Sequence, residues 1–355
     1  MRNIPAFAYH SAKTLKCELQ KIFCSTWNFV CHKNEIKQIN SYVVRTIGKE
    51  EVLIVRKSVD SIVAYLNLCP HRSAKLVNSE DGQCKGQLLC PYHAWTFNLD
   101  GELIKIPSQD HYLKDLNKEK YKLTKIRCDE WSGLVFVNFN SLTSPLKSYL
   151  GEFPAYLKEQ ERDISTMELI TTVILEEPIN WKIVVENYVE DYHFSFVHPK
   201  TLKSFDHKAT QTLPTKDHVR VFMPYRKKVT LGRSKYPWSP AGGGSQQGFI
   251  WPNMTLQPAL NHMSIFQIVP LGPEITRVRI AVYQTAAQKE QWPMNLEQLI
   301  SDIKLDMEED FSICRDLQHN THSRYYKIGV LSKPHELGIE HFANTWWSYM
   351  DKQAA

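Results

Sequence analysis

Two short segments of the chain combine a cysteine with a nearby histidine. Cys69 and His71 form a C-x-H pair, and Cys90 and His93 form a C-x2-H pair, each with a proline directly after the cysteine. Residues 72–89 separate the two pairs. Thiolate and imidazole groups are common ligands of zinc and iron. The repeated pairing, in a chain with only eight cysteines, therefore indicates a metal site formed by these four side chains.

Two kinds of metal site fit this ligand set. A structural zinc ion accepts two thiolates and two imidazoles, but zinc modules usually pair cysteine with cysteine and histidine with histidine along the chain. Here each loop supplies one of each. That arrangement is typical of a two-iron cluster in which one iron binds both thiolates and the other binds both imidazoles. The spacing favours the iron–sulfur cluster over zinc.

The two loops resemble the cluster loops of Rieske [2Fe–2S] domains. The segments CPHRSAKL and CPYHAWTFNLDGEL match the family's pattern, and Trp95 occupies its aromatic position beneath the second loop. The resemblance implies that Cys69, His71, Cys90 and His93 hold a [2Fe–2S] cluster. Imidazole ligands raise the reduction potential of such a cluster above that of clusters with four cysteines.

The same loops depart from the family's usual sequence at three positions. Ser73 and Ala74 stand where a Gly-Ala pair is usual, and Ala94 stands where the second loop usually has glycine. Glycine permits backbone conformations that other residues adopt only at a cost. Because all four ligands are intact, we expect an altered fit of the loops with the cluster retained.

A second group of metal-binding residue types follows in the other half of the chain. The pattern over residues 181–194 predicts a helix, with Pro199 stopping it. Glu190 and His193 are three residues apart, so they would share one face of that helix. His198 lies five residues beyond His193, about 140° further round, and joins it only if the helix ends or bulges there.

The spacing E/D-x2-H-x4-H downstream of a Rieske domain resembles the mononuclear iron motif of Rieske oxygenase catalytic subunits. The resemblance implies that His193 and His198 are two ligands of a facial triad, which leaves positions open for dioxygen. It also gives Glu190 the role of a carboxylate bridge to His93 of a neighbouring chain, for electron transfer. Asp191 is the alternative for that role, although it would point about 100° away on a helix.

A facial triad also needs a carboxylate, which the family places more than a hundred residues later. The acidic segment DMEEDFSICRDLQ, which begins at Asp306, resembles the family's terminal helix, where an acidic pair precedes a glutamine. Asp310 stands eight residues before Gln318 and is the predicted third ligand. Asp306 and Asp316 are weaker alternatives, because acidic residues on a helix usually form only its solvated face.

The surrounding sequence predicts an α+β fold in three parts. Residues 1–40 are expected to form a helix and lead-in that pack with the catalytic domain, residues 41–140 an all-β Rieske domain, and residues 141–355 the mononuclear iron domain. Apparent strands such as HMSIFQIVPLG alternate with helices near 181–194 and 294–320 in the last part. We expect a helix-covered antiparallel sheet there, of the START/SRPBCC type that the resemblance implies.

Composition restricts the class of protein. The chain has 355 residues, 43% hydrophobic and 23% charged, which is typical of a folded protein. Its net charge of +5 is small and gives no reason to expect a nucleic-acid partner. No apolar run approaches the roughly 20 residues of a membrane helix, and the first residues do not form a signal peptide. We expect a cytoplasmic protein without a membrane partner.

The resemblance implies an oxidoreductase, namely the terminal oxygenase component of a mono- or dioxygenase system. The implied cofactors are the Rieske cluster and a mononuclear Fe(II), and the implied assembly is a homotrimer in which each cluster serves the next subunit's iron. The chain has no GxGxxG or flavin site, so an NAD(P)H-dependent reductase of the flavin or ferredoxin type must be a separate partner. Arg72 and Lys75 are candidates for docking it.

The identity of the small-molecule substrate depends on weaker signals. Glu190 in NYVEDYH resembles oxygenases that act on quaternary ammonium compounds such as carnitine or glycine betaine. Aromatic faces hold such cations well, and the catalytic half offers Tyr188, Phe194, Phe196, Phe205, Phe222, Tyr225, Phe249 and Trp251. Two alternatives stay open: hydroxylation or demethylation of an aromatic or alicyclic ring, and a non-enzymatic Rieske electron carrier with a ligand-binding domain.

Overall fold

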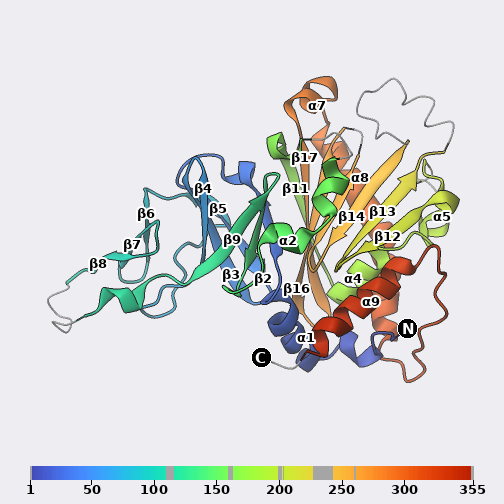
Figure 1. Cartoon of the computed structure of the whole chain (residues 1–355), viewed down its shortest axis with the longest axis horizontal. Helices are drawn as coiled ribbons and strands as arrows, with labels where there is room; N and C mark the ends of the chain where they lie inside the picture. The colour runs from blue at the N-terminus through green and yellow to red at the C-terminus, as the bar shows by residue number, and fades with distance from the viewer. Residues whose placement is uncertain are drawn as a thin grey trace. The chain divides into compact units, whose positions relative to one another are not determined.

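The chain forms two compact units, one of Met1–Phe23 with Lys147–Ala355 and the other of Cys24–Leu146. The computed structural model describes residues 2–108, 116–158, 163–198, 202, 204–226, 243–259 and 261–352. Every pairing between named strands in either unit is antiparallel (Figure 1). Together with the helices of the larger unit, this confirms the predicted α+β class.

The smaller unit is built almost entirely of strands. A seven-stranded sheet runs in the order β1-β10-β9-β4-β3-β2-β5, and a three-stranded sheet runs β6-β7-β8. The strands are β1 (Asn28–His32), β2 (Ser41–Ile47), β3 (Glu50–Ser58), β4 (Ser61–Leu66), β5 (Asp81–Gln83), β6 (Gln87–Leu89), β7 (Thr96–Asn98), β8 (Leu103–Lys105), β9 (Lys125–Trp131) and β10 (Leu134–Asn138). Because β1 pairs with β10, residues 24–40 belong to this unit.

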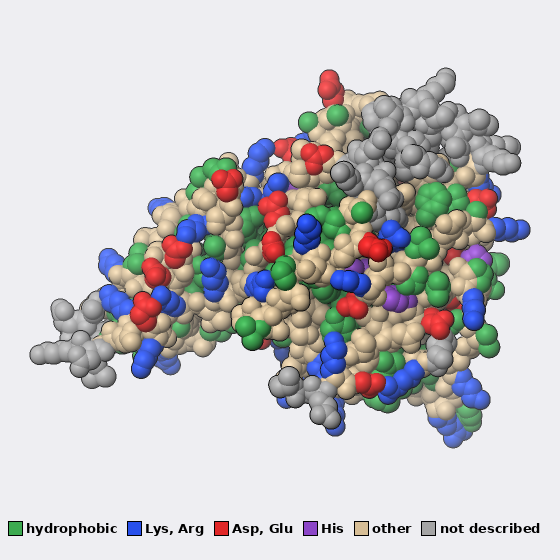
Figure 2. Space-filling model, viewed as in Figure 1, with side chains coloured by type: hydrophobic (Ala, Val, Ile, Leu, Met, Phe, Trp, Pro, Cys, Tyr) green, Lys and Arg blue, Asp and Glu red, His purple; other side chains and the backbone are tan. Residues whose placement is uncertain are grey.

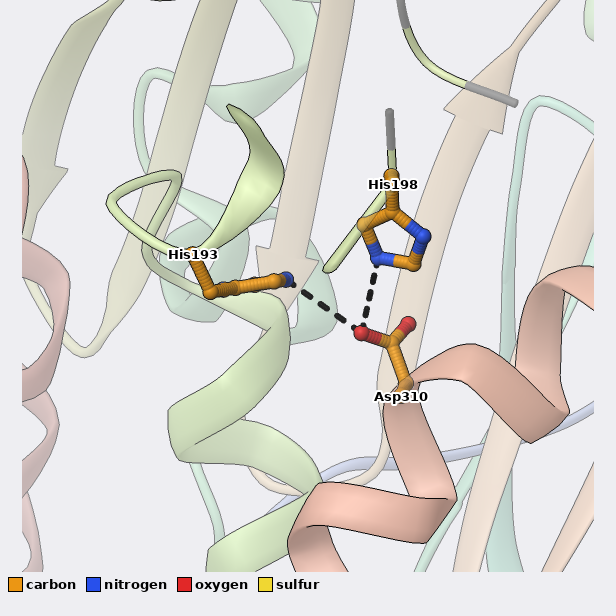
Figure 3. A group of neighbouring side chains, drawn as sticks. All are labelled: His193, His198 and Asp310. Carbon is orange, nitrogen blue, oxygen red and sulfur yellow. Dashed lines mark hydrogen bonds and ion pairs between the residues drawn. The ribbon is translucent and has the colours of Figure 1, made fainter. Parts of the chain in front are cut away.

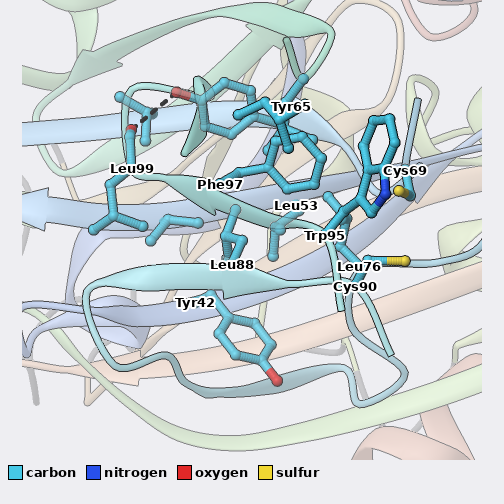
Figure 4. Packing of buried hydrophobic residues seen from close by; sticks show 14 of the residues in the cluster. Tyr42, Leu53, Tyr65, Cys69, Leu76, Leu88, Cys90, Trp95, Phe97 and Leu99 are labelled. Carbon is cyan, nitrogen blue, oxygen red and sulfur yellow. Dashed lines mark hydrogen bonds between the residues drawn. The ribbon is translucent and has the colours of Figure 1, made fainter. Parts of the chain in front are cut away.

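One hydrophobic core connects the strands of the smaller unit to its two cysteine–histidine loops. Leu53, Tyr65, Leu88 and Phe97 are fully or almost fully buried in it. Tyr65 also donates a hydrogen bond from its hydroxyl to the Leu99 carbonyl at 2.9 Å, which satisfies its buried polar atom. Cys69, Cys90 and Trp95 belong to the same core (Figure 4). The loops are therefore anchored by packing as well as by backbone hydrogen bonds.

The larger unit contains a seven-stranded sheet in the order β11-β17-β16-β15-β14-β13-β12. Strands β16 and β17 of this sheet are buried at most of their positions, including some polar ones such as Gln267. The strands are β11 (Glu168–Glu177), β12 (Gln211–Thr215), β13 (His218–Pro224), β14 (Gly244–Ile250), β15 (Met254–Pro258), β16 (Met263–Gly272) and β17 (Ile275–Gln284).

Helices cover this sheet. The α-helices in the described part of the chain are α1 (Ala12–Glu18), α2 (Leu146–Leu150), α3 (Phe153–Lys158), α4 (Trp181–Tyr188), α5 (Phe194–Val197), α7 (Ala286–Gln291), α8 (Leu296–Asn320) and α9 (Leu337–Met350). Helix α4 packs against β16, α8 and α9 (Figure 1). Helix α8 is the helix predicted near 294–320; its buried face consists of Met307, Phe311, Cys314 and Gln318 at helical spacing.

A buried ion pair joins three helices of the larger unit. Lys182 Nζ on α4 lies 2.7 Å from Glu18 Oε1 on α1, and both side chains are completely buried. Trp181 and Trp346 donate from their indole nitrogens to the same carboxylate at 2.9 and 2.7 Å. Lys182 also donates to the carbonyl of Ala8 at 2.9 Å. The network therefore fixes α4, which precedes His193 and His198 in the chain, to α1 and α9.

Removing one charge of this pair should destabilise the larger unit strongly. For Lys182→Met we expect a loss of about 3–5 kcal/mol in the free energy of unfolding, because the Glu18 carboxylate would stay buried without its cation. Urea unfolding followed by circular dichroism measures the loss. Lys289→Met is the control, since Lys289 and Glu168 form an exposed pair, and it should cost less than about 1 kcal/mol. Equal losses in the two variants would contradict a structural role for the pair.

Charges are mixed over the surface. Basic and acidic side chains alternate on the face shown in Figure 2, without an extended patch of one sign among the described residues there. Within the described part of the chain, none of the helices combines the length and the apolar character needed to cross a membrane.

Candidate metal centres

The two cysteine–histidine loops of the smaller unit share one backbone geometry. In the first, the Cys69 carbonyl accepts from Ser73 N at 2.9 Å, and Cys69 N donates to the Ala74 carbonyl at 2.8 Å. In the second, the Cys90 carbonyl accepts from Ala94 N at 3.0 Å, and Cys90 N donates to the Trp95 carbonyl at 2.9 Å. The same tight turn thus follows each cysteine, although the sequences differ.

This turn requires a left-handed backbone at the position where the family usually has glycine. Ser73 has φ = 57° and Ala94 has φ = 55°. An ordinary side chain in this region costs about 1–2 kcal/mol, and glycine avoids that cost. Both loops form the turn with serine or alanine at this position.

The side chains of the two loops fit a Rieske cluster. Cys69 and Cys90 are 1% and 2% exposed, and burial, together with the neighbouring Cys90 thiol, raises the pKa of Cys69 to about 11. The rings of His71 and His93 lie 4.7 Å apart, centroid to centroid. Their Nδ1 atoms are buried and make no hydrogen bond to any described residue. Two buried thiols, and two imidazole nitrogens without a hydrogen-bond partner among the described residues, are the donors that the two irons need.

Trp95 supports the imidazole side of this site. Its indole stacks on the ring of His71 with centroids 4.5 Å apart and planes 6° from parallel. The ring of Tyr92 stacks on that of His93 at 3.7 Å. Trp95 is 2% exposed, whereas Tyr92 is 55% exposed. One aromatic ring therefore fixes a ligand from inside the core, and the other covers a ligand at the surface.

His193 and His198 of the larger unit do not lie on one continuous helix. Helix α4 ends at Tyr188, and His193 is the residue that precedes the short helix α5. The prediction of a helix over 181–194 was therefore wrong beyond Tyr188. Glu190 explains the break, because its carboxylate accepts from Tyr192 N at 2.5 Å and from His193 N at 3.4 Å and so caps a new turn. Pro199 lies outside the described residues.

The break brings both histidines toward a carboxylate on α8. Nε2 of His193 lies 3.3 Å from Asp310 Oδ1, and Nε2 of His198 lies 2.9 Å from the same oxygen (Figure 3). One ligand atom from each of the three residues lies within 4.8 Å of the others. Asn187 Nδ2 on α4 also donates to Asp310 Oδ1, at 3.2 Å. His193, His198 and Asp310 therefore lie together as a group of two histidines and one carboxylate.

The charges of this group suit a divalent cation. Burial raises the pKa of Asp310, but His193 and His198 outweigh it and lower that pKa to about 2. Burial lowers the pKa of His193, but Asp310 and Glu190 raise it to about 9. Without a metal, protons on the imidazoles therefore balance the buried carboxylate. Fe(II), for which two imidazoles and a carboxylate are a typical facial ligand set, can take the place of those protons.

The other predicted acidic residues occupy different positions. Glu190 contacts Nδ1 of His193 with its carboxylate. Asp191 is buried and accepts a hydrogen bond from His335 Nδ1 at 3.0 Å. It therefore contacts a distant loop and not the two histidines. Asp306 Oδ1 lies 3.7 Å from His198 Nδ1, on the opposite side of that ring from Asp310. Asp316 is exposed on α8 and outside the group.

Glu309 was missed by the sequence analysis. Its Oε2 lies 2.8 Å from His198 Nδ1. His198, Asp306 and Glu309 form a second group whose ligand atoms lie within 4.8 Å of one another. The acidic pair that directed attention to Asp310 includes Glu309, but helical spacing alone does not show that two adjacent carboxylates reach opposite nitrogens of one ring.

A small cavity of about 70 Å³ borders the three ligand side chains. Among its lining residues are the aromatic rings of Tyr188, Phe194, Phe266 and Phe311. A larger cavity of about 620 Å³ shares five lining residues with it, namely Leu202, Gln257, Phe266, Asp306 and Met307. The two cavities together provide room for a small organic molecule beside His193, His198 and Asp310, and a route toward these side chains.

The aromatic residues that the sequence offered for a substrate site occupy different places. Tyr188 and Phe194 line the small cavity. Phe196 is 81% exposed, whereas Phe249 and Trp251 pack against Phe342 in the core. Phe205 and Tyr225 stack on each other at 5.0 Å, and Phe222 is not among the residues that line either cavity. Phe266 and Phe311 were missed, because periodicity cannot separate a cavity-facing aromatic ring from a core one.

The two residues proposed to dock a reductase have partners of their own within the smaller unit. The guanidinium of Arg72 lies 5.7 Å from the centroid of the Tyr92 ring, and Lys75 Nζ lies 2.6 Å from Glu51 Oε1. Both contacts are exposed, and an exposed ion pair contributes less than about 1 kcal/mol. Both side chains therefore remain available for a further contact at the surface.

Two family models match the chain. Residues 164–352 match the catalytic domain of the ring-hydroxylating alpha subunit, and residues 26–127 match the Rieske [2Fe–2S] domain. The first match covers more than half of the chain and contains every residue of the iron group. The second contains all four residues of the cysteine–histidine loops.

Curated relatives and solved structures agree with these matches. The carnitine monooxygenase oxygenase subunit of Acinetobacter pittii is 29% identical over 91% of this chain and 86% of its own. The large oxygenase component of a naphthalene 1,2-dioxygenase system of Pseudomonas aeruginosa is 30% identical over 78% of this chain and 61% of its own. The solved structure of a quaternary ammonium Rieske monooxygenase superposes with a TM-score of 0.86, at 26% identity over 98% of this chain and 95% of its own.

Proposed function

The chain belongs to the ring-hydroxylating alpha subunits, the catalytic subunits of Rieske oxygenases, and from this premise we propose that it oxidises a small quaternary ammonium compound. It is an oxidoreductase with a [2Fe–2S] cluster and a mononuclear iron, and it works with a separate reductase. The proposed reaction is hydroxylation or oxidative cleavage of the substrate with O2. The carnitine monooxygenase subunit and the quaternary ammonium monooxygenase structure support this substrate class.

The observation that carries the proposal is the lining of the cavity beside the iron group. The rings of Tyr188, Phe194, Phe266 and Phe311 surround it, and the carboxylate of Asp306 borders both cavities. Among the described lining residues, the side chains with a fixed charge are aspartates. Aromatic faces attract a desolvated cation by about 2 kcal/mol, and a nearby carboxylate adds to that attraction. A trimethylammonium group fits such an environment better than an uncharged ring does.

We assign the metals to two ligand sets. Cys69, His71, Cys90 and His93 would hold the cluster, and His193, His198 and Asp310 would hold the iron. The cluster supplies one-electron storage and transfer, and the iron, with its open positions, supplies the chemistry of dioxygen. The protein's own contribution is to orient these ligands and to exclude water from the substrate. The aromatic lining of the small cavity excludes the water.

Glu190 is the proposed link between subunits. Its carboxylate contacts Nδ1 of His193 and is in the place that the family uses for a bridge to a Rieske histidine. We assign the other end of this bridge to His93 of a neighbouring subunit in a homotrimer. The exposed Tyr92 beside His93 is compatible with a surface that another subunit covers. The reductase is proposed to be NAD(P)H-dependent, of the flavin or ferredoxin type.

The cation-binding part of the proposal predicts an effect of Asp306→Asn. We expect the KM for a quaternary ammonium substrate to rise about tenfold, because the loss of one carboxylate near the cation costs roughly 1.4 kcal/mol. Substrate-dependent O2 consumption and product formation are measured with carnitine, γ-butyrobetaine, glycine betaine and naphthalene. Asp316→Asn is the control, since Asp316 is exposed on the same helix. Iron content is checked in both variants, because Asp306 lies near His198.

Two results would reject the substrate class. One is coupled oxidation of naphthalene with no oxidation of any ammonium compound, which would favour the ring-hydroxylating alternative. The other is an unchanged KM for the ammonium substrate in Asp306→Asn at full iron content. An unaltered Asp316→Asn variant ensures that a change in KM comes from the position of the charge and not from the net charge of the protein.

A further inference from the structure

Each histidine of the iron group has both ring nitrogens engaged by carboxylates. The Nε2 atoms of His193 and His198 share Asp310. On the other side of each ring, Nδ1 of His193 contacts Glu190, and Nδ1 of His198 lies 2.8 Å from Glu309 Oε2. The family role proposed for Glu190 accounts for the first glutamate. Nothing in the proposed function accounts for the second.

We propose that Glu309 is a positioning residue for the iron site: it accepts the Nδ1 proton of His198 and thereby directs the Nε2 lone pair of that ring toward the metal. This inference rests on the proposed function, since it assumes iron at His193, His198 and Asp310. A neutral imidazole has one N–H and one lone pair, so the partner of one nitrogen decides which nitrogen can bind a metal. Carboxylate partners of this kind also make the ligand more basic.

Helix α8 holds the His198 ring from two sides. Glu309 and Asp310 are consecutive residues, so their side chains leave the helix about 100° apart. The His198 ring lies between them, with Glu309 Oε2 at 2.8 Å from Nδ1 and Asp310 Oδ1 at 2.9 Å from Nε2. The His198 side chain is only 1% exposed. One rigid helix therefore fixes both the tilt of the ring and its tautomer.

The neighbouring carboxylate of Asp306 is a weaker candidate for the same role. Its Oδ1 lies 3.7 Å from His198 Nδ1, beyond hydrogen-bond distance, and it borders both cavities. A second metal ion held by His198, Asp306 and Glu309 is the competing interpretation, because their ligand atoms lie within 4.8 Å of one another. That ion would need both nitrogens of His198 as ligands, and hence the loss of the ring proton.

The test is the affinity of the protein for ferrous iron, measured by competition with a chromophoric chelator under anaerobic conditions. The full-length protein with its cluster is compared with Glu309→Ala, Glu309→Gln and the control Glu308→Ala. Glu308 is the preceding residue on α8, and its exposed side chain contacts Arg315. We expect Glu309→Ala to weaken iron binding about 10- to 100-fold and Glu308→Ala to leave it unchanged. Glu309→Gln should lie between them, because its amide oxygen still accepts the Nδ1 proton.

Three outcomes would overturn the inference. The first is wild-type iron affinity in Glu309→Ala, and the second is an equal loss of affinity in Glu308→Ala. The third is a second iron outside the cluster in each wild-type chain, which Glu309→Ala removes. His193→Ala is measured in parallel: if this variant also keeps its iron affinity, the proposed iron site itself has failed. If only His193→Ala loses iron, the role of Glu309 alone is rejected. Should Glu309→Ala fail to fold, the isosteric Glu309→Gln carries the test, with a measurable loss expected.

Discussion

His193→Ala should abolish substrate oxidation while the visible spectrum of the Rieske cluster stays unchanged. His193 belongs to the larger unit, and the cluster loops belong to the smaller one. Loss of a partner that only orients a ligand costs about 10- to 100-fold in activity, so loss of the ligand itself should cost more than about 100-fold. Product formation with reductase, NADH and an ammonium substrate measures the effect, and the absorbance spectrum reports the cluster.

A matched histidine variant separates this effect from general damage. His319 is exposed near the end of α8, the helix that also carries Asp310. His319→Ala should retain wild-type turnover and iron content. Turnover by His193→Ala at more than a tenth of the wild-type rate, with iron present, would contradict the assignment of His193 as a ligand.

Glu190→Gln should leave both metals bound but break the passage of electrons between them. Glutamine keeps an oxygen near Nδ1 of His193, yet it lacks the charge that a bridge between two imidazoles supplies. We expect oxidation of the prereduced cluster, in the presence of substrate and O2, to slow by about 10- to 100-fold. Stopped-flow absorbance in a single turnover measures this rate, and metal analysis verifies that both metals remain.

The neighbouring Asp191 provides the control for this prediction. It is buried and accepts from His335, so Asp191→Asn should have a smaller effect on the rate of cluster oxidation than Glu190→Gln. If Asp191→Asn slowed cluster oxidation and Glu190→Gln did not, the bridge would have to be reassigned. Normal coupled product formation by Glu190→Gln would remove the bridging role altogether.

The cluster loops were the most predictable part of the chain, because their chemistry is local. Each loop places its cysteine and histidine within four residues, and the turn that follows each cysteine is closed by hydrogen bonds within the loop. Even the unusual Ser73 and Ala94 could be interpreted in advance, since the family has glycine where these residues adopt positive φ. Short-range geometry of this kind can be predicted from the sequence without knowledge of the tertiary fold.

The iron group depended on contacts that sequence patterns do not contain. Asp310 is 112 residues from His198, and only the resemblance to a family connected them. The predicted helix over 181–194 failed at Glu190, where a side chain caps the backbone of its neighbours instead of continuing the helix. Glu309 was missed for a related reason: its partner is a ring held in place by a different segment of the chain.

The substrate cavity was the least predictable part. Aromatic residues of the catalytic half lie in the core, on the surface and around the cavity. Trp251 packs against Phe342 in the core, whereas Phe266, fifteen residues later, lines both cavities. Which face of a buried strand meets a cavity is decided by the helices that cover the sheet, and those come from distant parts of the chain.

The most direct test of the central claim is the content of iron and acid-labile sulfide per chain in anaerobically purified protein, with an EPR spectrum after reduction. Two metal sites predict about three irons and two sulfides, with a signal of the Rieske type. Two irons that do not rise to three when ferrous iron is added would contradict the mononuclear site and favour an electron carrier. Zinc without sulfide would contradict the cluster and, with it, the whole assignment.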